Sequence, residues 1–354
     1  MDKEDNLTKY SKPSEIGLRP IGNTSYLNAA LQCIGNIYEL AEYFLKKSNQ
    51  SFFESNIKKM PLSFAIGRLF IHIYPYPEKE EKSPYGNESI LGVLGFYNQT
   101  FNSINKRDIK DLINLIFEKL HDELNSIKNS YNIINSMSYD KFNIKASYIN
   151  QIDFFYNNNK SIISYLFTFF IKKEYHCSFC KKTKCDYIHF NTFDLDIFEC
   201  ANNSGSGNIS IYDCLNYFTA CKCLNFFCQN CKKQTKTNII SKIYDCPNIF
   251  TFLLRSDLEK GNLIKFKIEK KINLKNYVEN KNTSEELELI GIISVFGEKY
   301  VSFSKSSINS RWYFYNDENV KFMDIDIIIE YNNNLNQYIP CILFYKLIND
   351  NENQ

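Results

Sequence analysis

Two Cys-x-x-Cys pairs constrain the fold of this chain more than any other feature. Cys177 and Cys180 form the first pair, Cys228 and Cys231 form the second, and 47 residues separate them. Two residues between cysteines let a tight turn point both thiolates at one tetrahedral Zn²⁺, and two such turns complete a closed four-sulfur site. The sequence therefore predicts one structural zinc ion that holds the tips of a β-ribbon together and offers no open position for catalysis.

Two other interpretations of these cysteines stay open. The chain has 12 cysteines, so the pairs could be reduced thiols without a metal. Lysines follow both pairs, at 181–182 and 232–233, as they would in a nucleic-acid-binding zinc ribbon. Against that, no basic cluster besides these lysines supports it, and the formal net charge of the whole chain is only +2. We therefore expect neither a nucleic-acid partner nor a membrane partner.

The composition is that of a globular protein. With 354 residues, of which 44% are hydrophobic, the chain can form one large or two ordinary cores. Residues 1–14 are charged and polar, so we expect a flexible leader and no secretory signal. The longest apolar stretch, Ile162 to Ile171, is shorter than the roughly 20 residues that a membrane span requires. These features predict an intracellular location, in the cytoplasm, the nucleus or both.

The stretch from Gly17 to Leu45 predicts a turn followed by a helix that begins at Ser25. Apolar residues recur at helical spacing, at Leu27, Leu31, Ile34, Tyr38, Ala41 and Leu45. Free backbone N–H groups and the helix dipole favour negative charge at such a helix start, which suits an activated nucleophile. The alternative is a turn that merely caps an amphipathic helix.

The run GLRPIGNTSYLNAALQCI in this stretch resembles the first motif of the ubiquitin-specific proteases, GLxNxGNTCYxNxxLQxL. The cysteine of that motif is the family's nucleophile, and this chain has Ser25 in its place. The family usually carries an asparagine five residues earlier, whose amide helps to stabilise the oxyanion. This chain has Pro20 there, which offers no side-chain donor.

A second predicted helix, Asp108 to Leu124, extends the resemblance, because its end LHDELN matches the LHEELN that closes the family's second motif. Asp108 is kept where the family places an aspartate near the basic tail of bound ubiquitin. Lys106 and Arg107 replace two glutamines of the motif, and their charge would repel that tail. His121 lies in the matched helix, where we expect a surface position and no catalytic role.

The resemblance continues to about Lys346. The second cysteine pair lies in FFCQNCKKQTKTNIISKIYDCPNIFTFLLRS, which is similar to the family's YxCxxCKxxxxAxKxxxIxxLPxxLxxxLKRF, and RWYFYNDENV is similar to WYxFDDxxV. A further helix is predicted at 62–73. Short apolar runs predict strands at Ile249–Leu254, Leu289–Phe296, Tyr300–Phe303, Trp312–Tyr315 and Cys341–Tyr345.

The family's general base is missing from its expected place. Lys299, followed by Tyr300, stands where the family has a histidine before a tyrosine. The residue that orients this histidine corresponds to Asn316, an acceptable variant of aspartate. The chain has four histidines, at 72, 121, 176 and 189, so residues 190–354 contain no histidine that could act as the base instead. Nucleophile, base and oxyanion residue are therefore all replaced, and we expect no hydrolysis.

The resemblance implies an α+β fold with a papain-like cysteine-protease core of the ubiquitin-specific protease type, built from a helical thumb, a β palm and zinc-tipped β fingers. One domain would cover residues 15–348, with the thumb at about 15–150, the fingers at about 165–245 and the palm at about 246–348.

Three functions remain open. A catalytically inactive protein could bind ubiquitin or a ubiquitinated partner, or serve as a scaffold in a larger assembly, and the kept Asp108 and Tyr300 are candidates for binding the ubiquitin tail. The chain could instead be an active deubiquitinase that uses a Ser25 and Lys299 pair, since Ser-Lys hydrolases exist. It could also be a purely structural subunit that binds no ubiquitin.

Overall fold

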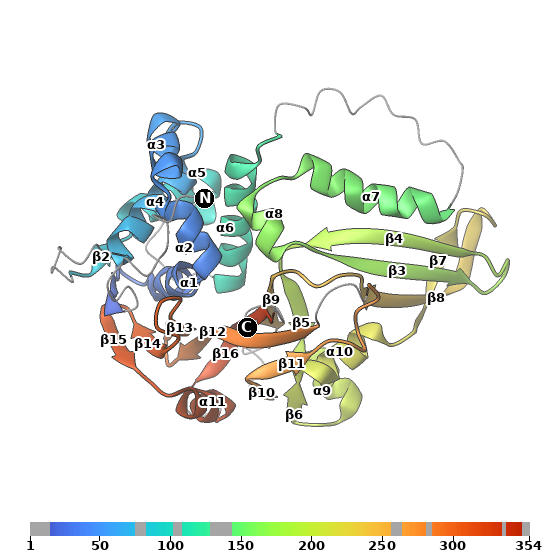
Figure 1. Cartoon of the computed structure of the whole chain (residues 1–354). Helices are drawn as coiled ribbons and strands as arrows, with labels where there is room; N and C mark the ends of the chain where they lie inside the picture. The colour runs from blue at the N-terminus through green and yellow to red at the C-terminus, as the bar shows by residue number, and fades with distance from the viewer. Residues whose placement is uncertain are drawn as a thin grey trace. The chain divides into compact units, whose positions relative to one another are not determined.

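The computed structural model describes residues 15–74, 83–101, 108–127, 144–255, 264–280, 285–334 and 338–348 (Figure 1). The expected leader, residues 1–14, lies outside the described residues, as do Lys106 and Arg107. Helices and strands are both abundant, which confirms the α+β class. Two compact units are present, Met1–Leu124 with Ile290–Phe344 and Asn125–Leu289 with Tyr345–Gln354. The limits of thumb, fingers and palm stay predictions.

Helices make up the N-terminal part of the first unit, together with the short parallel pair β1 (Leu18–Arg19) and β2 (Tyr85–Gly86). The helical segments are α1 (Ser25–Gly35), α2 (Tyr38–Leu45), α3 (Lys47–Ser55), α4 (Pro61–Ile73), α5 (Glu88–Tyr97), the 3₁₀ turn η3 (Gln99–Phe101), α6 (Ile109–Leu124) and, later in the chain, α11 (Ile325–Asn333). The helices expected at 62–73 and 108–124 are confirmed as α4 and α6, whose apolar residues are buried.

The strands of this unit follow the order β15-β14-β13-β12-β16. They are β12 (Glu286–Phe296), β13 (Lys299–Lys305), β14 (Trp312–Asn316), β15 (Asn319–Phe322) and β16 (Ile339–Leu347), so the strands predicted here are confirmed. Small residues let α1 lie close to the sheet. Ser304 Oγ donates to Cys33 Sγ at 3.3 Å, and a Cβ on Gly291 would lie 3.4 Å from the same sulfur.

The helix predicted up to Leu45 is two helices, so that prediction was wrong about its continuity. α1 ends at Gly35, Ile37 is extended, and α2 starts at Tyr38. Asn36 explains the break, because its amide donates to Gln32 O at 2.9 Å and to the Tyr315 hydroxyl on β14 at 3.1 Å. The regular apolar spacing across the break concealed this end, since only the Asn36 side chain marks it.

Three helices form in stretches for which the sequence predicted no helix. α3 has few apolar residues, yet its Phe53 is buried against Phe44 with ring centroids 5.5 Å apart. α11 extends to Asn333, because the buried Asn332 accepts from Ser294 Oγ and donates to Ile328 O. Residues 126–160 are rich in Asn, Ser, Lys and Tyr, which predicts a connecting segment, but α7 (Ile144–Asn158) occupies part of it. Residues 128–143 lie outside the described part of the chain.

A buried carboxylate joins α6 to α4. Glu123, 6% exposed, accepts the backbone N–H groups of Leu62 and Ser63 at 2.9 and 2.7 Å and the hydroxyl of Tyr97 at 2.6 Å. Leu62 and Ser63 lie in the first turn of α4, whose N–H groups have no partner inside the helix. The negative charge of Glu123 therefore caps α4 and fixes the position of α6 beside it.

Glu123→Gln is expected to lower the free energy of unfolding by about 2–3 kcal/mol, since one buried N–H group then faces an NH₂ group instead of a carboxylate oxygen. Urea denaturation followed by circular dichroism measures the change. Glu118→Gln removes the same charge from an exposed position of α6, where its ion pair with Lys119 contributes little. Equal effects of the two substitutions would contradict the capping role of Glu123.

The second unit contains a four-stranded antiparallel sheet of order β4-β3-β8-β7. Its strands are β3 (Phe169–Cys177), β4 (Thr183–Phe190), β7 (Lys222–Cys228) and β8 (Lys233–Ile243). The β3–β4 and β7–β8 hairpins lie side by side through β3 and β8, with Cys177 opposite Thr237. Both hairpin tips are therefore at the same end of the sheet, and each tip is a Cys-x-x-Cys turn.

The remaining elements of this unit surround an aromatic core. They are α8 (Ile162–Phe167), β5 (Phe193–Asp196), α9 (Ile197–Ser204), β6 (Asn208–Ser210), α10 (Ile211–Thr219), β9 (Ile249–Arg255), β10 (Lys265–Lys267) and β11 (Lys271–Asn273). β9 confirms the strand predicted at 249–254, and it pairs in parallel with β5. The core includes Phe169, which packs against Phe193 and Phe250. Among the described residues, we find no helix long and apolar enough to cross a membrane.

Candidate functional site

Ser25 is the first residue of α1 and is buried, with 7% of its surface exposed. A tight turn positions it: Ile21 N donates to Thr24 Oγ1 at 2.8 Å, and Gly22 adopts a left-handed φ of 64°. Thr24 O then accepts the N–H of Leu27 at 3.0 Å, which starts the helix. The predicted helix-start position of Ser25 is therefore the observed one.

The start of β13 lies directly beside Ser25. The backbone N–H of Tyr300 donates to Ser25 Oγ at 3.1 Å. This bond brings together residues that lie 275 positions apart in the chain and places Lys299 next to the helix start. A backbone N–H cannot take up the hydroxyl proton, so this contact does not supply the base that Ser25 would need as a nucleophile.

Lys299 forms an ion pair with the residue that follows the predicted Asn316. Lys299 Nζ lies 3.3 Å from Asp317 Oδ2, and the lysine side chain is 60% exposed whereas that of Asp317 is only 6% exposed. Asn316 is the last residue of β14, where it pairs with Asn319 across the turn. Asp317 has a left-handed φ of 53°, a conformation that non-glycine residues seldom adopt.

A buried polar chain holds Asp317 in place. Its Oδ1 accepts from Asn28 Nδ2 at 2.8 Å, and Asn28 Oδ1 accepts in turn from Asn87 Nδ2 at 2.6 Å. Leu18 N donates to Asp317 O at 2.9 Å, and Gly17 is required nearby because a Cβ there would overlap the backbone of Glu318. Asn28 and Gly17 both belong to the motif that begins at residue 17. Asn28 holds the side chain of Asp317, and Gly17 leaves room for the backbone of Glu318.

Sequence reasoning missed Asp317 and Asn87. The signal for Asp317 was present, since the motif WYxFDDxxV has two acidic positions and this chain keeps the second. Asn87 lies in no motif that we compared, and only the fold brings it to Asn28. Pro20 lies half-buried between β1 and α1 and has neither a side-chain donor nor a backbone N–H.

The two candidates for binding a ubiquitin tail lie near one another at the start of α6. Asp108 is exposed and its Oδ1 accepts the N–H of Lys110 at 2.8 Å, which closes the first turn of the helix. Burial raises the pKa of Tyr300, and the nearby charges of Cys341 and Asp108 add to this, whereas a hydrogen bond with the backbone of Ile109 lowers it. The Tyr300 hydroxyl therefore lies beside the Asp108 end of α6.

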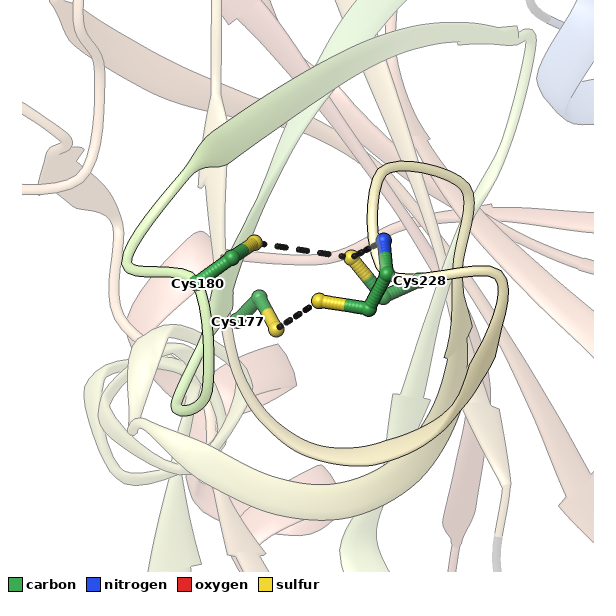
Figure 2. Close-up of side chains that lie close together, drawn as sticks. Cys177, Cys180 and Cys228 are labelled. Atoms are coloured by element: carbon green, nitrogen blue, oxygen red, sulfur yellow. Dashed lines mark hydrogen bonds between the residues drawn. The ribbon is translucent and has the colours of Figure 1, made fainter.

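The four paired cysteines form one cluster at the tips of the two hairpins (Figure 2). All four sulfurs lie within 4.8 Å of one another, with Cys177 Sγ 3.8 Å from Cys231 Sγ and Cys180 Sγ 3.8 Å from Cys228 Sγ. Four sulfurs at the Zn–S bond length form a tetrahedron with edges of about 3.8 Å. The cluster thus fits Zn²⁺, and the predicted meeting of two distant turns is confirmed.

The backbone of both turns is that of a metal-binding knuckle. The second cysteine of each pair is followed by a lysine with a left-handed φ, 60° at Lys181 and 53° at Lys232. Their N–H groups return to Cys177 O at 3.0 Å and Cys228 O at 2.7 Å. The backbone N–H of Cys231 donates to Cys228 Sγ at 3.4 Å. N–H donors of this kind stabilise thiolates, the form that binds metal.

The Thr235 hydroxyl also favours the metal-binding form. It lies 3.3 Å from Cys177 Sγ and is the main reason that the pKa of this thiol falls to about 6. Burial and the neighbouring sulfurs raise the pKa of Cys231 to about 12. Zinc binding would release the protons that the four thiols still carry, because thiolates are the ligands. Zinc bound here would be structural, because four protein sulfurs complete its coordination.

Comparison with known proteins matches most of the chain to one protein family. Residues 16–345 match the family described as ubiquitin carboxyl-terminal hydrolase. Ubiquitin carboxyl-terminal hydrolase 4 of Saccharomyces cerevisiae (strain YJM789) is 24% identical over 72% of this chain and 29% of its own length. Probable ubiquitin carboxyl-terminal hydrolase 1 of Schizosaccharomyces pombe is 30% identical over 54% of this chain and 23% of its own length. The chain thus spans under a third of these two relatives.

Another Schizosaccharomyces pombe protein, probable ubiquitin carboxyl-terminal hydrolase 16, is 24% identical over 92% of this chain and 67% of its own length. Among solved structures, the SAGA DUB module Ubp8/Sgf11/Sus1/Sgf73 bound to monoubiquitin is similar in fold. The TM-score is 0.67 at 18% identity, over 95% of this chain and 70% of the compared one. The same module bound to ubiquitin aldehyde gives a TM-score of 0.65, also at 18% identity, over 98% and 71%.

Proposed function

The chain belongs to the ubiquitin carboxyl-terminal hydrolase family, and from this we propose that it is a member that binds ubiquitin or a ubiquitinated protein without hydrolysing it. The ion pair between Lys299 and Asp317 is the observation that carries the loss of hydrolysis. Attack by Ser25 requires a neighbouring group that takes up the hydroxyl proton. An ammonium group paired with a carboxylate has no lone pair for that proton.

Two further features of the site support the same conclusion. The hydrogen-bond partner of Ser25 Oγ is the backbone N–H of Tyr300, which cannot take up a proton, and Lys299, at the position of the base, donates to Asp317. Pro20 supplies no donor for an oxyanion, a loss that in other enzymes costs on the order of a hundredfold or more in rate. The side chains at the nucleophile, base and oxyanion positions are therefore all changed, whereas the turn and helix around Ser25 are kept.

The binding half of the proposal rests on the Asp108 end of α6. Asp108 is exposed, negatively charged and close to the buried Tyr300, which suits it to contact a basic, extended peptide. The solved relatives with the same fold are complexes with monoubiquitin or ubiquitin aldehyde and with further assembly subunits. We infer by analogy that ubiquitin or a ubiquitinated protein is the partner and that a larger assembly is its setting in the cell.

Isothermal calorimetry with ubiquitin is expected to show saturable binding that Asp108→Asn weakens about fivefold, the effect of losing one exposed ion pair. Asparagine keeps the helix cap and removes only the charge. Asp111→Asn is the matched control, because Asp111 is exposed on the same helix. No saturable binding at millimolar ubiquitin would leave the purely structural role.

A ubiquitin–fluorophore substrate tests the other half, and the unmodified chain is expected to release no fluorophore above background. Turnover that Ser25→Ala and Lys299→Met both abolish would overturn the proposal and establish the Ser25 and Lys299 pair as a working dyad. The two assays are independent, so loss of hydrolysis and retention of binding can each fail alone.

A further inference from the structure

Positive charge is concentrated on the zinc-tipped sheet. Its two hairpins, Phe169–Phe190 and Lys222–Ile243, carry ten lysines and only two carboxylates, a formal charge of +8. The whole chain carries +2, so the remaining residues sum to −6. Four thiolates around one Zn²⁺ would lower the charge of the hairpins only to +6. The near-neutral net charge of the whole chain argued against a polyanionic partner, but it conceals a strongly basic pair of hairpins.

One face of this sheet brings lysines into contact with aromatic rings. Lys184 Nζ lies 5.9 Å from the ring centroid of Tyr175, which stacks at 4.8 Å on Phe226. At the tip, Lys233 Nζ lies 3.7 Å from the ring centroid of Phe179. The strand register explains the arrangement: Tyr175 is opposite Lys184, and β7 and β8 place Phe226 opposite Thr235, two residues from Lys233. Residues at alternate positions share a face of a sheet.

Much of this apolar surface is open to solvent. Phe179 is 68% exposed and Phe226 is 38% exposed, and Lys184, Lys222 and Lys233 are all exposed. The carboxylate on this face, Asp186, lies 3.0 Å from Lys184 Nζ. A surface of this kind attracts a polyanion and offers it flat rings. We call the set Tyr175, Phe179, Lys184, Lys222, Phe226 and Lys233 the basic aromatic face.

We propose that the basic aromatic face binds single-stranded nucleic acid, with its lysines on the phosphates and its exposed rings stacked on bases. Single strands fit better than a duplex, because unpaired bases can stack on side chains that lie on an open surface. An acidic polypeptide would match the charge equally well but makes no special use of flat rings that lie beside lysines. The zinc ion would stabilise the face without touching the ligand.

Fluorescence anisotropy of the zinc-loaded full chain with labelled oligouridylate and oligodeoxythymidylate tests the proposal. Binding is expected to weaken as sodium chloride is raised, with a log–log slope of about −0.7 for each phosphate contacted. Replacing Lys184, Lys222 and Lys233 together with glutamine is expected to reduce the magnitude of that slope by about 2. The RNA and DNA arms show whether the 2′-hydroxyl matters.

The matched control replaces three exposed lysines outside the sheet, Lys265, Lys271 and Lys275, with glutamine. It removes the same charge and is expected to leave the slope unchanged. Zinc content and circular dichroism of every variant establish that the sheet is intact. Equal losses in the two triple variants, or no oligonucleotide binding at low salt, would overturn the proposal.

Phe226→Leu separates the two kinds of polyanion. Leucine keeps apolar contact but cannot stack on a base, so oligonucleotide affinity is expected to fall about fivefold or more. Binding of polyglutamate would change little in this variant. Oligonucleotide affinity that is unaffected by Phe226→Leu, together with tighter binding of polyglutamate, would identify an acidic polypeptide as the ligand and contradict the nucleic-acid proposal. The outcome does not depend on whether ubiquitin binds.

Discussion

Cys228→Ser is expected to abolish stoichiometric zinc binding and to unfold the tips of both hairpins, the largest structural effect that a single substitution should have in this chain. Metal binding to structural zinc sites contributes about 10–16 kcal/mol at neutral pH. The β7–β8 hairpin has little else to stabilise its tip, because residues 222–227 of β7 are all exposed and even the rings of Phe226 and Phe227 are only partly buried. The metal would replace the missing core.

Mass spectrometry under native conditions measures the zinc, and hydrogen exchange of β7 and β8 measures the unfolding. Cys223→Ser is the control, because Cys223 lies on the same strand, is exposed and takes no part in the four-sulfur cluster. It should keep both the metal and the protection of the amides. Removing zinc from the unmodified chain with a chelator should reproduce Cys228→Ser. Hairpins that stay protected without metal would contradict a structural role for zinc.

The zinc centre could be predicted in full because its determinants are local. Two pairs of cysteines with two-residue spacing are typical of metal-binding knuckles, so the sequence identified Cys177, Cys180, Cys228 and Cys231 as the candidate ligands. Apolar spacing likewise identified α4 and α6, whose buried faces are continuous. Nothing local showed which lysines and rings share a face of the sheet, since Lys184 and Phe226 meet Tyr175 only through strand register.

Long-range partners account for what the sequence did not reveal at the candidate active site. The family resemblance placed Ser25, Lys299 and Asn316 at functional positions, but it did not show that Lys299 pairs with Asp317. The break after α1 has a similar origin, because Asn36 reaches Tyr315 on a strand near the other end of the chain. Side chains whose partner is distant in sequence have no periodic pattern from which the contact can be inferred.

The preserved turn suggests that hydrolysis can be restored by changing side chains alone. Ser25→Cys with Lys299→His is expected to release fluorophore from a ubiquitin–fluorophore substrate at a measurable rate, whereas the unmodified chain releases none. A thiol at the start of α1 gains nucleophilicity from the helix N-terminus. Residue 299 lies beside position 25, since Tyr300 N is 3.1 Å from Ser25 Oγ.

Asp317 supplies the remaining part of this expectation. Its buried carboxylate, held by Asn28 and now paired with Lys299, is placed to orient an imidazole at position 299 and to stabilise its protonated form. Asp317→Asn in the restored variant should therefore lower kcat by a larger factor than it changes KM. Adding Pro20→Asn should raise kcat about a hundredfold by supplying an oxyanion donor. A restored variant that folds and binds ubiquitin but stays inactive even with Pro20→Asn would show that more than these three side chains separates the chain from a working protease.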